Sequence, residues 1–341
     1  MRFIGADLHK KSITFCVVET VEREVRVVSR QRILCSEVER IENYISSHGP
    51  CELTVETTIG YEWFAGLAEK ICKRVVLAHA GKLRIIAEST RKTDKIDAYV
   101  LAEFLARDMI PAAWRPTLRV RQHRTLVRRR SKIQCRITSV KNSVRAVLTR
   151  YNKDQSNLFT RLGREAAQQI MKDLLTEDQW VLDDLLHELD EHTSRLKRVD
   201  QRLVEFSKSA SVGEKEARDV LATMPGIGAV TADTILAELG DWTRFKNADA
   251  VVSYAGLDPG VRESDGRRKD LRISKAGSPL LRWIMIQLAQ RLKRTTVRWG
   301  RMFDQISRRA GKKKATVAVA RRLLLVIYAM LRDGNAYKMA A

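Results

Sequence analysis

The sequence predicts an α/β region with a mixed sheet, followed by a longer region that is entirely helical. The first hundred residues alternate β-branched strand segments with amphipathic helical segments, the pattern of an α/β domain. Beyond Pro116 the apolar residues recur at heptad spacing, as they do in helices that pack side by side. The chain has 341 residues, 44% of them hydrophobic, so it can fill two or three domains and their cores.

Strands and helices are expected to alternate through the first 108 residues. Three strand segments come first, with a tight turn near His9–Lys11, and the later strands are separated by helical segments. This order indicates a mixed sheet, because only the later strands have the long connections that parallel pairing needs. The expected strands are Arg2–Ile4, Ser12–Glu19, Arg23–Arg30, Leu53–Val55 and Val75–His79, and the expected helices are Ser36–Ser47, Tyr61–Cys72 and Asp94–Arg107.

Residues 109–210 carry two heptad series and are predicted to form a helical arm. In the first series, Leu126, Ile133 and Val140 are each seven residues apart. The second series runs from Leu182 to Phe206, with apolar residues three and four positions apart. Such spacing predicts coiled-coil packing, either between two long antiparallel helices of one chain or across a dimer seam. We therefore expect a homo-oligomer, from dimer to tetramer.

Residues 211–341 are predicted to form a helical region that engages DNA. The segment Met224-Pro-Gly-Ile-Gly resembles the turn of helix-hairpin-helix modules, in which glycines expose backbone N–H groups to a phosphate. Gly226 and Gly228 are therefore candidate nucleic-acid-binding residues, although a tight turn without any DNA contact gives the same pattern. A loop rich in glycine and arginine and two further helices are expected beyond it, at Gly260–Asp270, Pro279–Leu292 and Thr316–Leu331.

The excess of positive charge indicates a nucleic acid as the partner. The formal net charge is +22, and a field of that sign concentrates polyanions. Most of the excess lies in two stripes, residues 107–150 and 291–322. A protein that binds acidic membrane surfaces more often shows one amphipathic basic helix. The binding residues predicted in the first stripe are Arg128, Arg129, Arg130, Lys132 and Arg136.

Four acidic residues lie where the predicted strands and helices begin or end. Asp7 and Glu56 end strands, and a strand end is the rim at which open α/β sheets place their sites. Asp94 and Asp97 are three residues apart and so share one face at a helix start. Converging carboxylates repel one another unless they hold a cation, and hard ions such as Mg²⁺ prefer oxygen ligands. Taken singly, the acids have simpler explanations, with Asp94 as a helix cap and Glu56 as a surface residue.

Together these residues resemble the retroviral-integrase-like nucleases, particularly those with the Holliday-junction resolvase (RuvC) fold. Five further motifs are Phe3-Ile-Gly-Ala-Asp, Val55-Glu-Thr-Thr, Arg91-Lys-Thr-Asp-Lys-Ile-Asp, Pro225-Gly-Ile-Gly and Tyr254-Ala-Gly-Leu-Asp-Pro. In this order they resemble the "one-ten" insertion-sequence transposases, which are related to the Piv pilin-gene invertases. The resemblance covers nearly the whole chain and departs from the family after Glu56, where Thr57-Thr58-Ile59-Gly60 replaces the usual Ala-Thr/Ser-Gly.

This resemblance implies three domains and a set of catalytic residues. The domains are a RuvC/RNase H-like catalytic domain at 1–108, a basic helical arm at 109–210 and a transposase domain with a serine loop at 211–341. The implied ligands of Mg²⁺ or Mn²⁺ are Asp7, Glu56, Asp94 and Asp97. The implied nucleophile is Ser264, the only serine of the loop Gly260–Asp270. The basic residues expected to contact phosphate there are Arg262, Arg267, Arg268 and Lys275.

The implied function is cleavage and rejoining of DNA strands during transposition. The implied partners are donor and target DNA and a structured noncoding RNA that guides target choice, in a prokaryotic cytoplasm at the nucleoid. Two other classes of protein remain open. A metal-dependent junction nuclease would use water as the nucleophile and would not need Ser264. A non-catalytic nucleic-acid-binding protein would need only the basic stripes.

Overall fold

The computed structural model describes residues 1–58, 60–86, 94–264 and 267–338, with the backbone alone at 84–86, 94–96, 261–264 and 267–270. The chain forms two compact units, Met1–Arg115 (unit 1) and Pro116–Ala341 (unit 2). No helix within the described ranges combines the length and the apolar character that crossing a membrane requires.

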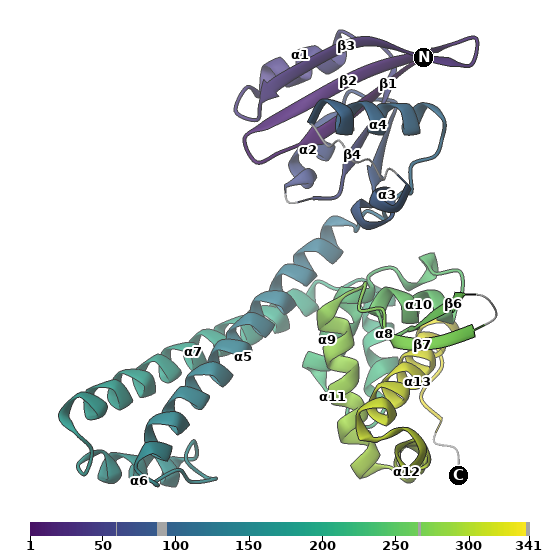
Figure 1. The fold of residues 1–341 in the computed structure, drawn as a ribbon. Helices are drawn as coiled ribbons and strands as arrows, with labels where there is room; N and C mark the ends of the chain where they lie inside the picture. Colours follow the sequence, from purple (N-terminus) through teal and green to yellow (C-terminus); the bar gives the residue numbers. More distant parts are fainter. Residues whose placement is uncertain (59, 87–93, 265–266, 339–341) are drawn as a thin grey trace. The chain divides into compact units, whose positions relative to one another are not determined.

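Unit 1 is built on a five-stranded mixed sheet (Figure 1). Its strands are β1 Arg2–Leu8, β2 Ser12–Val21, β3 Glu24–Leu34, β4 Cys51–Glu56 and β5 Arg74–Ala78. They lie in the order β3-β2-β1-β4-β5. The pairs β1–β2 and β2–β3 are antiparallel, and the pairs β1–β4 and β4–β5 are parallel. The predicted mixed sheet is confirmed, and each of its five predicted strands is present.

Helices cover both faces of this sheet, because successive side chains of a strand point to opposite faces. The helices are α1 Val38–Ser46, α2 Tyr61–Ala68, α3 Ala80–Ile86 and α4 Asp94–Ala106. Phe15 and Val17 of β2 are buried in one core cluster with residues of α1 and α2. Cys16, between them, is buried with Ala98 of α4 in another cluster. Helix α4 therefore lies on one face of the sheet, and α1 and α2 lie on the other.

The segment that follows α4 still belongs to unit 1. The backbone N–H of His79 donates to the carbonyl of Pro111 at 2.9 Å, and that of Ala113 donates to the carbonyl of Leu77 at 2.7 Å. These bonds tie residues 109–115 to the end of β5. Unit 1 thus extends to Arg115, and unit 2 begins at Pro116.

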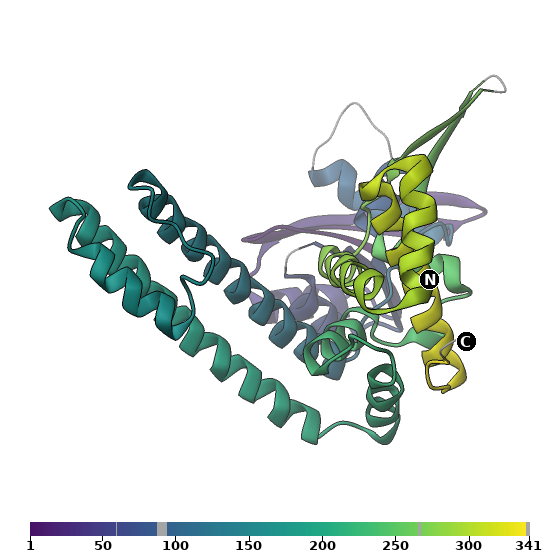
Figure 2. The same ribbon diagram turned by 90° about the horizontal axis from the view of Figure 1, so that it is seen from below.

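Unit 2 begins with the predicted arm, which is a pair of long helices. They are α5 Leu118–Arg150 and α7 Thr176–Lys208, joined through α6 Arg161–Met171, and they lie antiparallel along one another (Figure 2). Ile133 and Val144 of α5 are buried in one cluster with Leu182 and Leu189 of α7. Of the two packings that the heptad spacing allowed, the one formed is the antiparallel pair within the chain. The apolar seam therefore needs no second chain to cover it.

The rest of unit 2 is a set of helices around a single apolar core, with a β-hairpin attached. The helices are α8 Val212–Ala222, α9 Ala229–Leu239, α10 Ala248–Ala255, α11 Pro279–Thr295, α12 Val297–Ala310 and α13 Lys312–Asp333, with a 3-10 turn at Trp242–Arg244. Helix α12 was not predicted from the sequence. Its apolar residues Trp299, Met302, Phe303 and Ile306 recur at helical spacing, a signal that was overlooked because the segment was interpreted only as a basic stripe.

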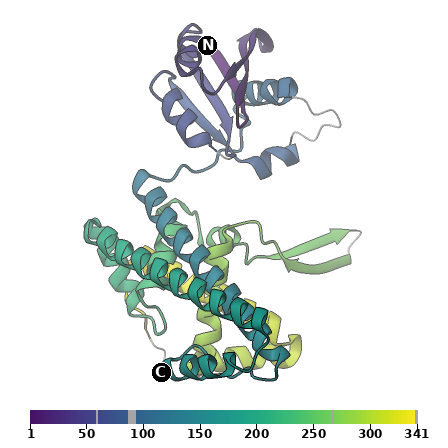
Figure 3. The same cartoon turned by 90° about the vertical axis from the view of Figure 1, so that its left-hand side faces the viewer.

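The expected loop Gly260–Asp270 is instead mostly an antiparallel hairpin. Its strands, β6 Pro259–Ser264 and β7 Arg267–Ile273, project from the helices of unit 2 (Figure 3). The expectation of a loop was wrong because charged residues crowd both strands and hide the usual alternation of apolar and polar residues. The Asp-Gly pair between the strands is a strong sequence signal for a hairpin and was overlooked.

We predict that Gly5→Ala destabilises unit 1. A Cβ at Gly5 would collide with the carbonyl oxygen of Ala98 and the amide nitrogen of Ala102, which are backbone atoms of α4 and cannot turn aside. Overpacking of this kind costs about 1–3 kcal/mol of unfolding free energy. Denaturant unfolding of the full chain, with hydrogen exchange read in β1 and α4, measures the loss.

The matched control is Gly66→Ala, in α2 of the same unit. A Cβ at Gly66 would lie 3.8 Å from Nη2 of Arg115, an ordinary contact, and alanine favours the helix. This control should keep or slightly raise the unfolding midpoint. Equal midpoints for the two variants would contradict the close packing of α4 on β1.

Candidate active site and nucleic-acid interface

Asp7 and Glu56 lie side by side near the ends of two adjacent parallel strands. The register of β1 and β4 pairs Ala6 with Val55, and the next residue of each strand is acidic. Ala6 and Val55 belong to the core cluster shared with α1 and α2. Because successive side chains of a strand point to opposite faces of the sheet, Asp7 and Glu56 point to the face that α4 covers. The Asp7 side chain is 13% exposed, and its Oδ2 lies 3.0 Å from Nε2 of His9.

Asp97 lies beside β1 because α4 packs directly on that strand. The contact is so close that the position opposite Ala98 must be glycine, Gly5. Asp97, one residue before Ala98, is half-buried, and Asp94 begins the helix. The side chain of Asp94 lies outside the described part of the structure. The backbone thus brings Asp7 and Glu56 together and places Asp97 next to the contact at Gly5.

The donors at this corner of the sheet fit a hard divalent ion. Asp7 and Glu56 both offer carboxylate oxygens, which Mg²⁺ and Mn²⁺ prefer. Among the side chains that the structure describes, no three carboxylate, imidazole or thiol groups lie close enough to hold a metal ion. Asp97 and Asp94 are the nearest further acids on the helix that covers this face.

Ser264 is the last residue of β6, at the outer end of the hairpin. In the strand register it stands directly opposite Arg267, and Arg262 stands opposite Lys269. The side chains of these residues and of Arg268 lie outside the described part of the structure, so the placement rests on the backbone. The register brings position 264 next to a basic position on the neighbouring strand.

The base of the hairpin is clamped by close contacts between two backbone segments. The N–H of Ser274 donates to the carbonyl of Asp258 at 3.0 Å, and Ser274 Oγ donates to the Asp258 carboxylate at 2.5 Å. The N–H of Ser278 donates to the carbonyl of Tyr254 at 3.0 Å. A Cβ at Gly277 would collide with that same carbonyl oxygen. The two segments at the base of the hairpin are therefore closely packed, while Lys275 between Ser274 and Gly277 is exposed.

The predicted helix-hairpin-helix turn joins α8 to α9. Gly226 has a φ of +82°, a conformation that side chains other than glycine rarely adopt. Gly228 precedes α9 as its N-cap and makes no side-chain cap, so the first N–H groups of the helix depend on other partners. The turn thus places a left-handed glycine two residues before the N-cap of α9, and its contact with DNA stays a prediction.

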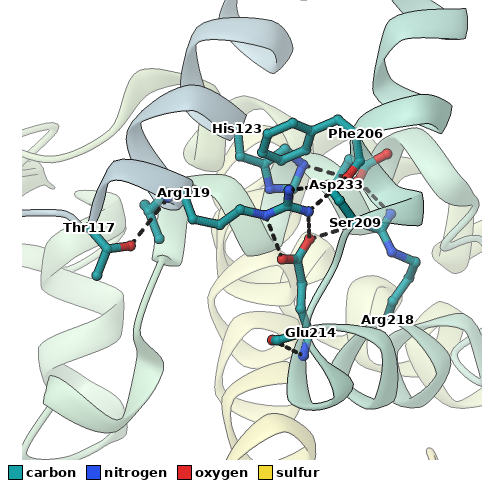
Figure 4. Close-up of polar contacts among 10 residues, drawn as sticks. Thr117, Arg119, His123, Phe206, Ser209, Glu214, Arg218 and Asp233 are labelled. Atoms are coloured by element: carbon teal, nitrogen blue, oxygen red, sulfur yellow. Dashed lines mark hydrogen bonds and ion pairs between the residues drawn. The ribbon is translucent and has the colours of Figure 1, made fainter.

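A buried ionic network joins the start of α5 to α8 and α9 (Figure 4). Asp233 of α9 is 6% exposed and accepts a 2.5 Å hydrogen bond from Arg218 of α8. Nε2 of His123, on α5, lies 3.1 Å from the same Oδ1 atom. Arg119 of α5 pairs with Glu214 of α8 at 3.0 Å. These contacts fix the base of the arm to the other helices of unit 2.

A second buried carboxylate on α9 adds to the contacts between α5 and the other helices of unit 2. Glu238 is fully buried and accepts two hydrogen bonds from Arg128 of α5, at 2.8 and 2.9 Å. It also accepts one from Ser278 Oγ, at 2.9 Å, the hydroxyl that caps α11 beside the hairpin base. Burial alone would raise the pKa of Glu238, but the hydrogen bonds and charge of Arg128, with Ser278 and Arg124, hold its pKa below the ordinary value.

The basic residues predicted to bind nucleic acid divide into two groups. Arg128 pairs with Glu238, and Arg130 pairs with Asp200 of α7 at 2.6 Å, so both guanidinium groups are engaged within unit 2. Arg129, Lys132 and Arg136 are exposed, and no carboxylate within the described residues pairs with them. The second group is the part of this stripe that can meet a phosphate.

Asp233 and Glu238 are the structural residues that sequence analysis missed. They sit five residues apart in a helix whose other residues are apolar or small. The sequence did carry a signal, since two acids on a mostly apolar helix indicate buried charges, and a buried charge needs a group that neutralises it. Their partners on α5 lie more than a hundred residues away in the sequence and gave no local pattern.

Comparisons with known proteins agree with these features. Residues 4–153 match the DEDD transposase family, and residues 218–305 match the family described as "Transposase IS116/IS110/IS902 family". A probable family 20 transposase of Pseudomonas aeruginosa is 25% identical, over 98% of each chain. A pilin gene-inverting protein of Moraxella lacunata is 25% identical, over 98% of this chain and 97% of its own. The transposase of insertion element IS1111A from Coxiella burnetii is 24% identical, over 74% of this chain and 70% of its own.

The carboxylate-bearing α/β unit and the basic helical unit thus define an enzyme that acts on DNA. The chain carries both transposase domains of the IS110/IS116/IS902 family, in the order amino-terminal DEDD domain and carboxy-terminal domain, and belongs to that family. The resemblance drawn from the sequence motifs is confirmed.

We predict that Arg128→Met destabilises unit 2, because it leaves the buried Glu238 without its main partner. Breaking a fully buried pair costs about 3–5 kcal/mol, and solvent on one side of Arg128 lowers the expected loss to about 2–3 kcal/mol. Adding Glu238→Gln to the variant should recover part of that loss. Denaturant unfolding of the full chain at pH 7 measures both effects.

The same pair predicts how the loss depends on pH. Since the pKa of Glu238 is lowered by folding, its ionised form stabilises the protein fully above the pKa of the unfolded carboxyl, about 4.3. That stabilisation is lost as the pH falls through the folded pKa. The difference between wild type and Arg128→Met should therefore shrink below about pH 4. A difference that stays constant down to pH 3 would mean that Arg128 stabilises unit 2 by packing alone.

Proposed function

We propose that this chain transposes an insertion sequence by metal-assisted, serine-mediated cleavage and rejoining of DNA strands. The observation that carries the proposal is the placement of Asp7 and Glu56 at adjacent ends of parallel strands. The five-stranded mixed sheet, in the order β3-β2-β1-β4-β5, supports the RuvC-like domain that the resemblance implies. Three functional parts are proposed along the chain: a RuvC-like catalytic part at 1–108, a basic arm at 109–210 and a transposase part with the serine at 211–341.

Asp7, Glu56, Asp94 and Asp97 are proposed as ligands of Mg²⁺ or Mn²⁺. When bound, a divalent ion at such a site supplies positive charge for the attacking and leaving oxygens of phosphoryl transfer. The protein's own part is to hold oxygen donors at a fixed corner of the sheet. The close contact of α4 with Gly5 fixes the helix that carries two of the four acids.

Ser264 is proposed as the nucleophile. Its Oγ attacks the phosphorus of a phosphodiester, a P–Oγ bond forms, and the bond from phosphorus to the oxygen of the leaving strand breaks. The hydroxyl proton passes to a base, and the leaving oxygen takes up a proton. A strand hydroxyl then attacks the phosphoserine ester in the reverse sense, so strands are rejoined without a nucleotide cofactor. The strand register supports this role, because it places position 264 opposite the basic position 267 of the neighbouring strand. Arg262, Arg267 and Arg268 are proposed to stabilise the charge on the transferred phosphate.

The proposed partners are donor and target DNA and a structured noncoding RNA that guides target choice. The exposed residues Arg129, Lys132 and Arg136 of the arm, and Lys275 at the hairpin base, suit contacts with nucleic-acid backbones. Gly226 and Gly228 are proposed to present backbone N–H groups to a phosphate. Recombination must hold two duplexes, so a homo-oligomer from dimer to tetramer is proposed, with its interface outside the arm seam that the chain itself buries.

The metal assignment predicts that Asp7→Asn and Asp97→Asn each lower strand cleavage about 100-fold or more, because each removes a charged ligand but keeps the side-chain shape. Cleavage of labelled duplexes carrying the ends of the element, in Mg²⁺, is the measurement. Glu39→Gln, at an exposed site of α1, is the control and should cleave normally. Full cleavage in EDTA, or by the Asp7→Asn variant, would contradict a metal site at these residues.

The serine assignment predicts that Ser264→Ala binds DNA normally but forms neither a covalent adduct nor a recombinant product. Ser253→Ala, at an exposed site of α10 outside the hairpin, is the control and should still form the adduct. Denaturing gels and mass spectrometry of trapped complexes provide the measurement. An adduct at Ser274 would refute Ser264 as the nucleophile. Cleavage at the wild-type rate by Ser264→Ala would instead favour a nuclease that uses water.

Mixing the inactive Ser264→Ala and Asp7→Asn proteins separates two ways of assembling the active site. Recombination by the mixture means that one protomer supplies the carboxylates and another supplies the serine. No recombination by the mixture, with both parents folded and bound to DNA, means that one protomer supplies both.

A further inference from the structure

A pocket of about 590 Å³ opens in unit 2 between the turn at Gly226 and the carboxy-terminal half of α11. Thr231, in the first turn of α9, lines one side, and Gln287, Arg291 and Arg294 of α11 line the other. The pocket involves none of the catalytic candidates. Arg291 and Arg294 lie at the start of the second basic stripe, in which no individual binding residue was predicted.

Glycine at position 226 keeps this pocket open. Its φ of +82° disfavours any other residue, and a Cβ there would lie 3.2 Å from Cδ1 of Leu288 and 3.3 Å from Cδ of Arg291. Both distances are shorter than ordinary contacts, so a side chain would press on the wall that carries the arginine. The glycine thus allows the turn to approach α11 while the space beside Arg291 stays accessible.

Positive charge in this pocket is not neutralised by the protein. Arg291 and Arg294 are exposed, and no carboxylate in the described part of unit 2 forms an ion pair with them. Arg291 and Arg294 are three residues apart on α11 and line the same pocket, so their charges repel each other and a bound anion would relieve that repulsion.

The walls of the pocket suit a particular kind of anion. Guanidinium groups bind phosphate oxygens through two parallel hydrogen bonds. Ile284 and Leu288 give the pocket an apolar wall, and the Gln287 amide can donate or accept a hydrogen bond. A space of this volume exceeds a lone phosphate and has room for the sugar beside it.

We propose that this pocket binds the sugar–phosphate backbone of DNA, with Arg291 and Arg294 on a phosphate and the sugar against Ile284 and Leu288. The inference rests on the proposed function for its choice of DNA as the polymer. It adds a binding site that is separate from the exposed basic residues of α5 and from the β6–β7 hairpin that carries Ser264. In this site Gly226 shapes the pocket and the α11 arginines supply the charge.

The test measures binding of the full-length protein to a 30-base-pair duplex by fluorescence anisotropy over a range of salt concentrations. Arg291→Gln with Arg294→Gln should raise the Kd about tenfold or more and lower the slope of log K against log salt by about 1.8, since two phosphate contacts are lost. The control, Arg308→Gln with Arg309→Gln, removes the same charge from exposed sites of α12 and should change both values much less. An equal change in both double variants would overturn the pocket site.

A second pair of variants tests the pocket without removing an arginine. Gln287→Glu places a negative charge in the pocket and should weaken binding, whereas Gln305→Glu, at an exposed site of α12, should not. Thermal unfolding confirms that each variant is folded. Wild-type affinity and salt slope for both Gln287→Glu and the Arg291/Arg294 double variant would refute the proposal. Loss of binding to a structured RNA hairpin with unchanged binding to the duplex would refute DNA as the occupant.

Failure of the pocket proposal can be distinguished from failure of the proposed serine mechanism. Covalent adduct formation at saturating DNA should be normal in the Arg291/Arg294 variant, because that variant keeps Ser264 and the carboxylates. If wild type formed no adduct but the salt slopes behaved as expected, the pocket would stand and the serine mechanism would fail. If adducts formed and the slopes did not change, the serine mechanism would stand and the pocket would fail.

Discussion

The arrangement of unit 2 depends on neutralising two carboxylates that α9 buries. A charged group loses its hydration in the interior, so Asp233 and Glu238 are tolerated only where cations or hydrogen-bond donors meet them. The partners come from several helices at once. His123 and Arg128 belong to α5, Arg218 belongs to α8, and the Ser278 hydroxyl caps α11. Neutralising the two carboxylates of α9 therefore holds α5, α8 and α11 together in one structure.

This neutralisation also limits which basic residues are free to bind nucleic acid. The chain has far more Lys and Arg than Asp and Glu, yet part of that excess is used inside unit 2. Arg128 and Arg130 are one turn or less from Arg129 and Lys132, but only the latter two face solvent without an acidic partner. A charge count along the sequence cannot separate these groups, because neighbours on a helix point in different directions.

Close contacts that only glycine permits position both sets of catalytic candidates. Gly5 lets α4 reach the backbone of β1, which places Asp97 beside the strand that carries Asp7. Gly277 lets the segment after β7 lie against Tyr254, which closes the base of the hairpin that carries Ser264. Neither glycine contributes to the chemistry, and the contact at Gly277 fixes only the base of the hairpin, whereas Ser264 lies at its outer end.

The sequence by itself determined the local elements and the motifs. β-branched runs located the five strands of unit 1, the heptads located the arm, and strand-end positions singled out Asp7 and Glu56. These features depend on residues near one another in the chain, which periodicity can detect. Helix α12 and the β6–β7 hairpin were missed although the sequence carries a signal for each, the apolar spacing from Trp299 to Ile306 and the Asp-Gly pair. Only the tertiary structure decided that the heptad seam closes within one chain and that Arg128 pairs with Glu238. It also decided that Gly226 lies close against Arg291 beside a pocket. Each of these joins residues that are far apart in sequence, and the pairing is set by packing and by the cost of an unpaired buried charge, which no local pattern records.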